Sequence, residues 1–368
     1  MAAIEHGPSP EQMIEAVPGW VDQPISGNPT DKNLISVKQL SADDIYDYIQ
    51  EAKAAEQAVA KLRGAPVAAF ACMKIIMEQP STRTAGSTLT AIQKLGGSGQ
   101  VISDRNATSE AKGESQADAW VAFATQADII GYRSATEYGP YLAAEAIAQS
   151  YNLKKLPKIA PIINLGNGKD EHPTQFLGDI MTIYDRFKGE LSGKTIAVVG
   201  DQERYRAHHS TILGAVILGM NVIAVESPVA PVPRDIVEFA GKRLQRTDDL
   251  DGAMQAADVL SVGRNPDEYT GNDEKEKLRS QALKESYDGW IIDRERLQQM
   301  PPDGVVMHPR PRRDELHPSI DDDPRAADVE QMAKMIPMRM TVIARHLGQS
   351  ISEYWNFDKR ITAIAPRR

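Results

Sequence analysis

A chain of 368 residues exceeds what one hydrophobic core supports and predicts two domains. Its 41% hydrophobic and 25% charged residues are typical of soluble globular proteins and exclude a fibrous or disordered chain. The formal net charge of −9 excludes a broad surface for nucleic acid or for an anionic membrane, so an anionic ligand needs a local basic pocket. We expect no membrane span and no secretion signal, and therefore a cytoplasmic location.

Residues 1–32 show no sustained period and are expected to form an N-terminal extension. Ser41 precedes a helical apolar period with acids in its first turn, which predicts a helix over 42–62. Short apolar runs and longer helical stretches then alternate, at 67–77, 85–97, 100–104, 114–127, 128–133 and 141–151. This rhythm predicts a parallel sheet with helices on both faces. The single cysteine, Cys72, lies in the first apolar run, where we expect a buried thiol on a strand.

A second series of helices and strands begins after Gln175. We expect helices at 176–187, 208–220 and 234–244, and strands at 195–201, 221–227 and 257–264. Residues 265–289 are polar and charged, which predicts a mobile surface loop followed by a short helix. The closing helix, 328–348, is long enough to return to the first domain. The predicted fold class is α/β, with two domains that each hold a parallel sheet flanked by helices.

The segment Ser81-Thr-Arg-Thr84 lies between an apolar strand and a helix. Free backbone N–H groups, hydroxyls and the Arg83 guanidinium at such a helix start can cradle a phosphate without a glycine-rich loop. Taken alone, this pattern is more typical of a simple helix cap. The phosphate site therefore needs independent partners.

Three further polar segments each follow a predicted strand. They are Arg133, His172-Pro-Thr-Gln175 and Met307-His-Pro-Arg-Pro-Arg-Arg313. Ligands of open α/β sheets bind beyond the carboxyl ends of the strands, so these groups are expected to meet the Ser81–Thr84 segment. An isolated His-Pro is more often structural, but the four segments together favour His172 as a functional donor.

Together with the opening Asn33-Leu-Ile-Ser-Val-Lys-Gln-Leu-Ser41, these segments resemble aspartate/ornithine carbamoyltransferases, from about Asn33 to about Gly348. The resemblance implies the carbamoyltransferase fold, with a carbamoyl phosphate-binding domain of residues 33–173 plus 334–368 and an amino acid-binding domain of residues 174–333. It implies an enzyme that needs no cofactor. No set of histidines and carboxylates has the spacing of metal ligands, and we expect no metal in the site.

The resemblance also implies roles for individual residues. The catalytic residues would be Arg83, Thr84, Arg133 and His172. Carbamoyl phosphate would contact Ser81, Thr82, Arg83, Thr84, Arg133, His172, Gln175, Arg310 and Pro311. Donors on Thr84, Arg133 and His172 would stabilise the oxyanion of the tetrahedral intermediate. Gln175 and the backbone carbonyls around Arg310 and Pro311 would accept the carbamoyl NH₂ group.

Two more arginines match family positions that bind aspartate. Arg206 would hold the α-carboxylate and Arg264 the side-chain carboxylate, and two fixed guanidinium groups suit a dicarboxylic amino acid. Residues 103–114 resemble a loop that reaches the active site of a neighbouring subunit, where Thr108 and Lys112 are the matching positions, and Lys112 would also bind aspartate. The implied assembly is a homotrimer with shared active sites, and the implied product is N-carbamoyl-L-aspartate, a pyrimidine precursor.

Several positions depart from the family pattern. Ala85 and Tyr269 replace arginines, Gln79 replaces a glutamate, and Pro266 replaces a glutamine. Arg310 adds charge where leucine or glycine is frequent. A carbamoyltransferase with another amino-acid or amine acceptor therefore stays open, as does a non-catalytic scaffold relative.

Other classes are weaker candidates. Pro-Arg-Pro stands where ornithine enzymes usually carry Cys-Leu-Pro, so ornithine is disfavoured as the acceptor. The turn after strand 195–201 lacks the glycines that a nicotinamide dinucleotide needs. The sequence leaves regulatory partners and assembly beyond a trimer open.

Overall fold

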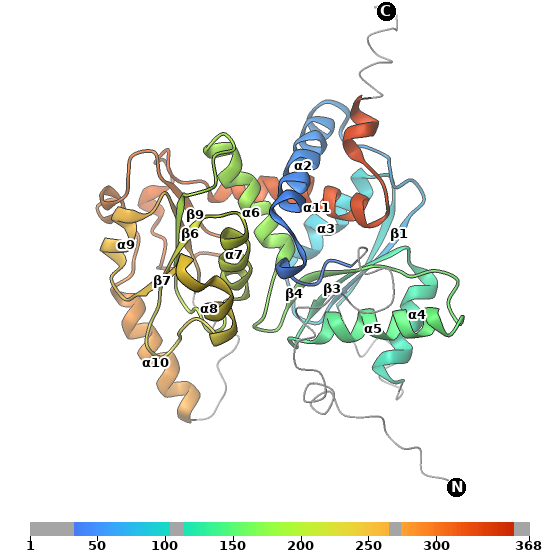
Figure 1. The fold of residues 1–368 in the computed structure, drawn as a ribbon, viewed down its shortest axis with the longest axis horizontal. Helices are drawn as coiled ribbons and strands as arrows, with labels where there is room; N and C mark the ends of the chain where they lie inside the picture. Colours follow the sequence, from blue (N-terminus) through green and yellow to red (C-terminus); the bar gives the residue numbers. More distant parts are fainter. Residues whose placement is uncertain (1–32, 104–113, 265–273, 357–368) are drawn as a thin grey trace, which may run out of the picture.

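The computed structural model describes residues 33–103, 114–264 and 274–356, which form two parallel sheets flanked by helices (Figure 1). The first sheet has the strand order β2-β1-β3-β4 and the second the order β7-β6-β5-β8-β9. The strands of the first sheet are β1 (Cys72–Met77), β2 (Ser98–Ile102), β3 (Ile129–Ser134) and β4 (Ile162–Asn167). Those of the second are β5 (Thr195–Val199), β6 (Asn221–Val225), β7 (Leu244–Thr247), β8 (Val259–Val262) and β9 (Val305–Met307). Every pairing between these strands is parallel, which confirms the predicted fold class.

The helices cover both faces of the sheets because the central strands are apolar on both faces. In the first half of the chain they are α2 (Ala42–Leu62), α3 (Thr82–Lys94), α4 (Gln116–Gln126), α5 (Gly139–Asn152) and α6 (Pro173–Arg186). In the second half they are α7 (Arg206–Ile217), α8 (Arg234–Ala240), α9 (Leu250–Ala256), α10 (Glu274–Asp288) and α11 (Asp328–His346). Short 3₁₀ turns occur at Val37–Gln39, Gly241–Arg243, Arg296–Gln299 and Pro318–Ile320.

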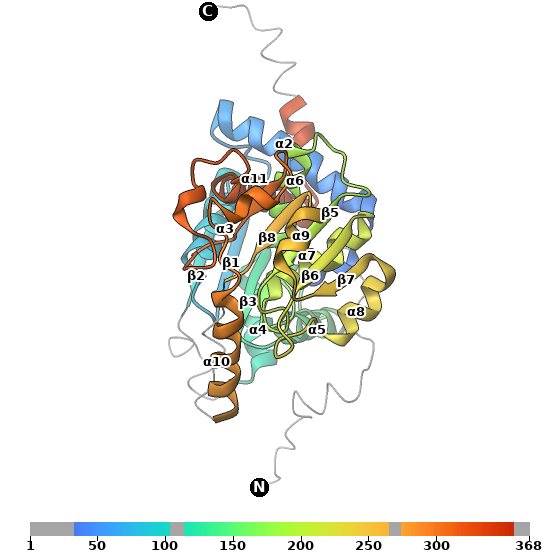
Figure 2. The ribbon, with the colours of Figure 1, turned by 90° about the vertical axis from the view of Figure 1, so that its left-hand side faces the viewer.

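The last helix, α11, returns to the first sheet as expected. It packs against α2, α3 and α6 (Figures 1 and 2). The Tyr48 hydroxyl of α2 lies 2.9 Å from Nε2 of His346, and Lys334 of α11 forms ion pairs with Glu56 and Asp185. Helix α11 therefore forms one packed layer with α2, α3 and α6, although it lies far from them in the sequence.

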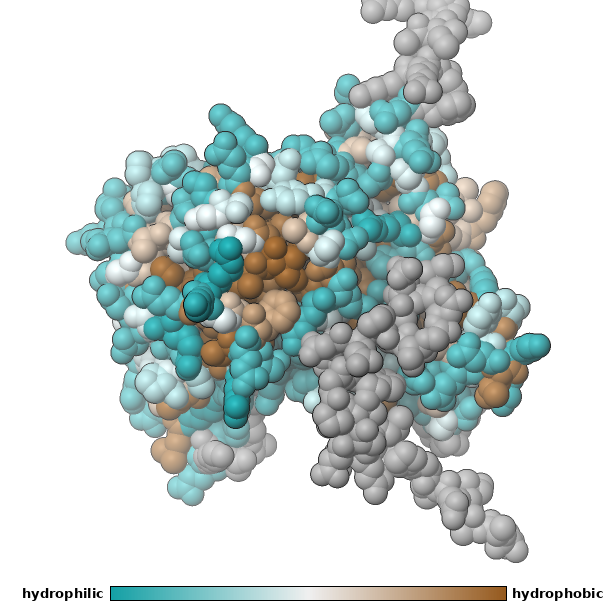
Figure 3. All heavy atoms as spheres, viewed as in Figure 1, coloured by the Kyte–Doolittle hydropathy of each residue, from teal (hydrophilic) through white to brown (hydrophobic). Residues whose placement is uncertain are grey.

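The two sheets share apolar packing. One core cluster includes Ile75 of β1, Phe176 of α6, Val198 of β5 and Met338 of α11. In the space-filling view, hydrophobic residues gather near the middle of the face, beside α7, and hydrophilic residues dominate the rim (Figure 3). A bipartite molecule with a continuous core results.

A buried carboxylate also joins the two halves. Glu171, in the loop between β4 and α6, accepts hydrogen bonds from the Val37 N–H at 2.9 Å and from the Ser210 hydroxyl of α7 at 3.0 Å, and it contacts the Ser36 hydroxyl. Burial, followed by the neighbouring Asp170, raises the pKa of Glu171. The opening segment, the β4–α6 loop and α7 thus meet at one buried point.

Some sequence-based expectations were wrong in detail. Cys72 lies on a strand but is exposed, because it is the first residue of β1, at the end where solvent reaches the sheet. The helix expected over 234–244 ends at Ala240, and Leu244 already begins β7. The helix after residue 273 is not short, since α10 has 15 residues.

Three expectations concern segments outside the described residues: the extension 1–32, the loop 104–113 and residues 265–273. Within the described ranges, no helix is both long and apolar enough to cross a bilayer.

Candidate active site

A cavity of about 210 Å³ lies where the carboxyl ends of the first sheet face the second half of the chain. It is built from α3, the end of β3, the start of α6, the β5–α7 loop, the loop after β9, and α11. Its lining residues are Ser81, Arg83, Thr84, Ser87, Arg133, His172, Gln175, Arg204, Tyr205, Arg206, Ala207, Arg264, Pro309, Arg310, Gln331, Met332, Met335, Ile336 and Arg339. No acidic residue is among them and seven are arginines, so the cavity is cationic even though Arg204 and Arg310 pair with Glu276 and Asp328 outside it.

The cavity brings together most of the predicted site residues. Those that line it are Ser81, Arg83, Thr84, Arg133, His172, Gln175, Arg206, Arg264 and Arg310. Thr82 and Pro311 are described but do not line it, although both are chain neighbours of lining residues. Thr108 and Lys112 lie outside the described residues.

The Ser81–Thr84 segment begins α3 as the sequence predicts. Ser81 is the N-cap residue, and its hydroxyl oxygen accepts a hydrogen bond from the Thr84 N–H at 3.3 Å. The first turn contains no acidic side chain, so the free N–H groups and the helix dipole favour an anion there. Arg83 lies on the same turn and donates through Nη2 to the Arg310 carbonyl at 2.6 Å. This contact ties α3 to the loop after β9.

His172 is the N-cap residue of α6 and is buried. Its backbone N–H donates to the Ser210 hydroxyl at 2.9 Å, which fixes the start of the helix. Burial, followed by the charges of Arg133 and Arg206, holds the pKa of His172 well below its usual range. The imidazole is therefore neutral at neutral pH and can donate a hydrogen bond without carrying charge.

The guanidinium groups of Arg133 and Arg206 both lie next to Gly166 in the cavity wall. Arg133 donates through Nη1 to the Leu165 carbonyl at 3.2 Å, and Arg206 donates through Nη1 to the Gly168 carbonyl at 3.0 Å. Gly166 has a φ of +110°, and a Cβ atom there would lie 2.9 Å from Nε of Arg206 and 3.1 Å from Nη1 of Arg133. Only glycine gives this backbone shape and leaves room for both arginines.

Two family models match the chain, and together they span most of it. The model of the aspartate/ornithine carbamoyltransferase carbamoyl-P binding domain matches residues 32–185, and that of the Asp/Orn binding domain matches residues 192–345. The chain belongs to the aspartate/ornithine carbamoyltransferase family. Its fold and sequence motifs agree with this assignment.

Curated relatives include the aspartate carbamoyltransferase catalytic subunits of Thermoplasma acidophilum and Thermococcus kodakarensis. They are 31% and 32% identical to this chain, and each match covers 86% of this chain and 98% or 97% of the relative. Among solved structures, aspartate transcarbamoylase of Trypanosoma cruzi in complex with aspartate and phosphate is 30% identical with a TM-score of 0.77, covering 85% of this chain and 96% of that one. The catalytic subunit of M. jannaschii aspartate transcarbamoylase is 30% identical with a TM-score of 0.73, covering 86% and 98%.

At a position where the family pattern has glutamate, Gln79 contacts a cavity arginine. Its Oε1 accepts a hydrogen bond from Nη1 of Arg206 at 2.6 Å. Because Gln79 is neutral, the positive charge of Arg206 is not neutralised by this contact. A ligand carboxylate can therefore still gain from it.

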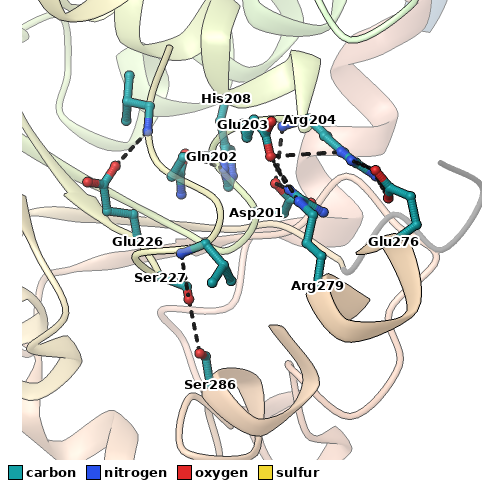
Figure 4. A network of polar contacts seen from close by, with 12 residues as sticks. Asp201, Gln202, Glu203, Arg204, His208, Glu226, Ser227, Glu276, Arg279 and Ser286 are labelled. Carbon is teal, nitrogen blue, oxygen red and sulfur yellow. Dashed lines mark hydrogen bonds and ion pairs between the residues drawn. The ribbon is translucent and has the colours of Figure 1, made fainter. Parts of the chain in front are cut away.

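Arg204 also lines the cavity, although no motif predicted it and its only sequence signal is its place two residues before Arg206. It donates to both carboxylate oxygens of Glu276 at 2.7 and 2.8 Å. Arg279, one turn later on α10, pairs with Asp201 and Glu203 in the same loop (Figure 4). These ion pairs hold helix α10 against the loop that leads to Arg206, the first residue of α7.

The wall formed by α11 was not anticipated either. Gln331, Met335 and Arg339 face the cavity from this helix. Burial lowers the pKa of Arg339 to about 10, its Nη1 contacts the Ser87 hydroxyl, and its buried Nε has no partner within the described part of the chain. No local motif marks these residues, because the cavity-facing side of α11 depends on tertiary packing.

In the ranges that the structure describes, no group of histidine, cysteine, aspartate or glutamate side chains could hold a metal ion. The polar groups that line the cavity are mainly hydrogen-bond donors and cations. Such a set suits anionic substrates whose oxygen atoms gain charge during the reaction.

Proposed function

We propose that this chain transfers the carbamoyl group of carbamoyl phosphate to the amine of L-aspartate, giving N-carbamoyl-L-aspartate, a pyrimidine precursor, and phosphate. The observation that carries the proposal is the cationic cavity that joins the α3 terminus, His172, Gln175 and the arginine pair Arg206 and Arg264. The names of the relatives and the aspartate and phosphate bound in the T. cruzi structure support it.

In the carbamoyl phosphate half of the site, Ser81, Thr82, Arg83 and Thr84 hold the phosphate with hydroxyl, backbone and guanidinium donors. Thr84, Arg133 and His172 surround the carbonyl oxygen, and Arg83, Thr84, Arg133 and His172 act as the catalytic residues. Gln175 and the carbonyls at Arg310 and Pro311 accept the carbamoyl NH₂ group. The substrate is therefore held at its phosphate, its oxygen and its amino group before reaction.

The uncharged amine attacks the carbamoyl carbon, and a C–N bond forms while the carbonyl becomes an oxyanion. The neutral His172 imidazole and the Arg133 guanidinium stabilise that oxyanion. The C–O bond to phosphate then breaks, and the departing phosphate takes the proton that the amine loses. No protein base is required by this balance.

In the acceptor half, Arg206 binds the α-carboxylate and Arg264 binds the side-chain carboxylate. Both arginines line the cavity, and Arg206 is buried. Lys112, with Thr108, completes the site from a neighbouring subunit, as the family loop does. The proposed assembly is therefore a homotrimer with shared active sites, located in the cytoplasm. The proposal leaves regulatory partners open.

We also propose that the domains divide at 33–173 plus 334–368 for carbamoyl phosphate and 174–333 for the amino acid. The return of α11 to α2 and α3 supports this division.

The test is ureido product formation from carbamoyl phosphate with L-aspartate, L-ornithine, acetylornithine and other small amines. We expect turnover with aspartate and with no other amine of the panel. Turnover with another amine would keep the carbamoyl phosphate site and replace the acceptor. Absence of turnover, despite tight carbamoyl phosphate binding, would indicate a non-catalytic relative.

A further inference from the structure

A buried carboxyl group lies directly behind Gln175 and is not part of the reaction described above. Asp179 is one helical turn after Gln175 on α6 and is only 6% exposed. Its Oδ1 accepts a hydrogen bond from Nε2 of Gln175 at 2.7 Å and another from Nε2 of Gln331, on α11, at 2.7 Å. Two carboxamides from different helices therefore converge on one carboxyl oxygen.

The directions of the hydrogen bonds that link His308, Gln331, Asp179 and Gln175 follow from a backbone group. The His308 N–H can only donate, and it donates to Oε1 of Gln331 at 3.0 Å. Gln331 must then present its NH₂ group to Asp179, whose Oδ1 must accept. The same oxygen accepts from Nε2 of Gln175, and unless Oδ1 itself carries a proton, Gln175 must also present its NH₂ group. The Oε1 atom of Gln175 is thereby left for the cavity, independently of how its amide is assigned.

We propose that Asp179 is a positioning residue that fixes the Gln175 carboxamide with its oxygen toward the cavity, so that the site selects a substrate carrying N–H donors beside its phosphoryl group. This inference rests on the proposed function, because it assigns the amino group of the carbamoyl donor to Gln175. It goes further in naming the residue that makes the site discriminate that amino group from a methyl group.

The same hydrogen bonds reach the opposite wall of the cavity. Arg310 donates its backbone N–H to Nδ1 of His308 at 2.9 Å, and the Arg310 carbonyl accepts from Arg83. Gln331 holds the His308 N–H of that loop, so Asp179 is connected to both proposed acceptors of the amino group, the Gln175 oxygen and the loop carbonyls. Loss of Asp179 should therefore affect recognition of the amino group more than recognition of the phosphate.

The hydrogen bonds from Gln175 and Gln331 to Asp179 do not require a charged carboxylate. The charged and titratable groups near it are Arg339 of α11 and the buried Tyr205 phenol of the β5–α7 loop. Burial raises the pKa of Asp179 to about 7, against the lowering effect of its bonds to Gln331 and Gln175. A proton on Oδ2 leaves both hydrogen bonds to Oδ1 in place, so Oδ1 can accept two N–H groups with Asp179 charged or neutral.

The experiment compares the binding of carbamoyl phosphate with that of acetyl phosphate, which carries a methyl group in place of the amino group. The wild-type chain should prefer carbamoyl phosphate by at least roughly tenfold, since a polar site left unpaired strongly disfavours the analogue. Asp179→Leu should reduce that preference about tenfold, with acetyl phosphate affinity within twofold of wild type. Asp179→Asn keeps an acceptor oxygen and should keep the preference within about threefold.

Thr182→Ala is the matched control, because Thr182 is buried on the same helix and bonds only to the Gly178 carbonyl among the described residues. It should leave the preference unchanged. A double-mutant cycle adds a second readout: Asp179→Leu should have little further effect in a Gln175→Ala background. Equal weakening of both ligands by Asp179→Leu, or full additivity with Gln175→Ala, would overturn the proposal.

If Asp179→Leu does not fold, Asp179→Asn and Gln175→Ala carry the test. Gln175→Ala must then lose the preference for carbamoyl phosphate over acetyl phosphate, while Asp179→Asn retains it. The opposite pattern would refute the positioning role of Asp179. A wild-type chain that does not bind carbamoyl phosphate would instead refute the proposed function, so the two failures are distinguishable.

Discussion

Replacing Arg206 tests the acceptor half of the proposed site most directly. Arg206 is 7% exposed, and its hydrogen bonds to Gln79 and to the Gly168 carbonyl are to neutral groups. A hydrogen bond to a charged group contributes about 1.5–3 kcal/mol, and each 1.4 kcal/mol corresponds to about tenfold in affinity. Arg206→Lys keeps the charge but loses the two-pronged geometry and should raise the KM for aspartate about tenfold. Arg206→Ala should raise it about a hundredfold.

The assay is steady-state kinetics with aspartate varied at saturating carbamoyl phosphate, together with the affinity for carbamoyl phosphate alone. Arg234→Ala is the matched control, because Arg234 belongs to the same half of the chain and is exposed on α8, where it pairs with Glu238. A KM for aspartate within twofold of wild type in both Arg206 variants would refute the assignment. An equal loss of carbamoyl phosphate affinity would also refute it.

Three further predictions follow from the site. Arg83→Ala should lower kcat/KM by about 10²-fold or more, because a charge-assisted phosphate contact is lost, and activity within twofold of wild type would exclude that role. Gly166→Ala should destabilise the fold by about 1 kcal/mol or more and impair activity, since a Cβ at φ +110° would displace Arg133 and Arg206; unchanged melting temperature and kinetics would contradict this. Burial raises the pKa of Asp179 to about 7, so the folded state retains a proton that the unfolded state releases near pH ~4, and Asp179 makes stability fall as pH rises between these values. Asp179→Asn should flatten urea-derived stability against pH by up to about 1.4 kcal/mol per pH unit, and an unchanged slope would show that Asp179 does not titrate in this window.

The sequence predicted the elements whose signals are local. The helix after Ser41 appears as expected, and in the structure it begins with a capping box, in which Ser41 and Asp44 bond each other's backbone N–H groups. Helix α3 also begins at the Ser81–Thr84 segment, as the sequence predicted. These features depend on hydrogen bonds within one turn, which neighbouring residues determine.

Short elements escaped prediction because their residues do not alternate clearly. Strand β7 has four residues with intermediate and exposed side chains, so its apolar pattern is too weak to separate it from the end of α8. Cys72 was misjudged because an apolar run does not reveal which strand residue lies at the solvent-facing end. Burial at a strand end depends on the neighbouring loops, which the run itself does not encode.

Site residues outside the motifs divide into two kinds. Asp179 could have been found, since a carboxylate one turn after Gln175 lies on the same helix face. Arg339 could not, because its approach to Ser87 depends on how α11 crosses α3. Sequence patterns thus identify groups that meet within one element, whereas the opposite wall depends on contacts between distant elements.

The return of α11 has a consequence for the order in which the protein matures during synthesis. A nascent chain that has not yet reached Asp328 already holds every strand assigned in the described ranges, the last of which ends at Met307. It lacks Gln331, Met335 and Arg339, and with them one wall of the cavity. Helix α11 can pack onto α2 only after residues 328–346 have been synthesised. The cavity is therefore completed only after both sheets have been synthesised, and a chain that stops before Asp328 contains both sheets but lacks one wall of the cavity.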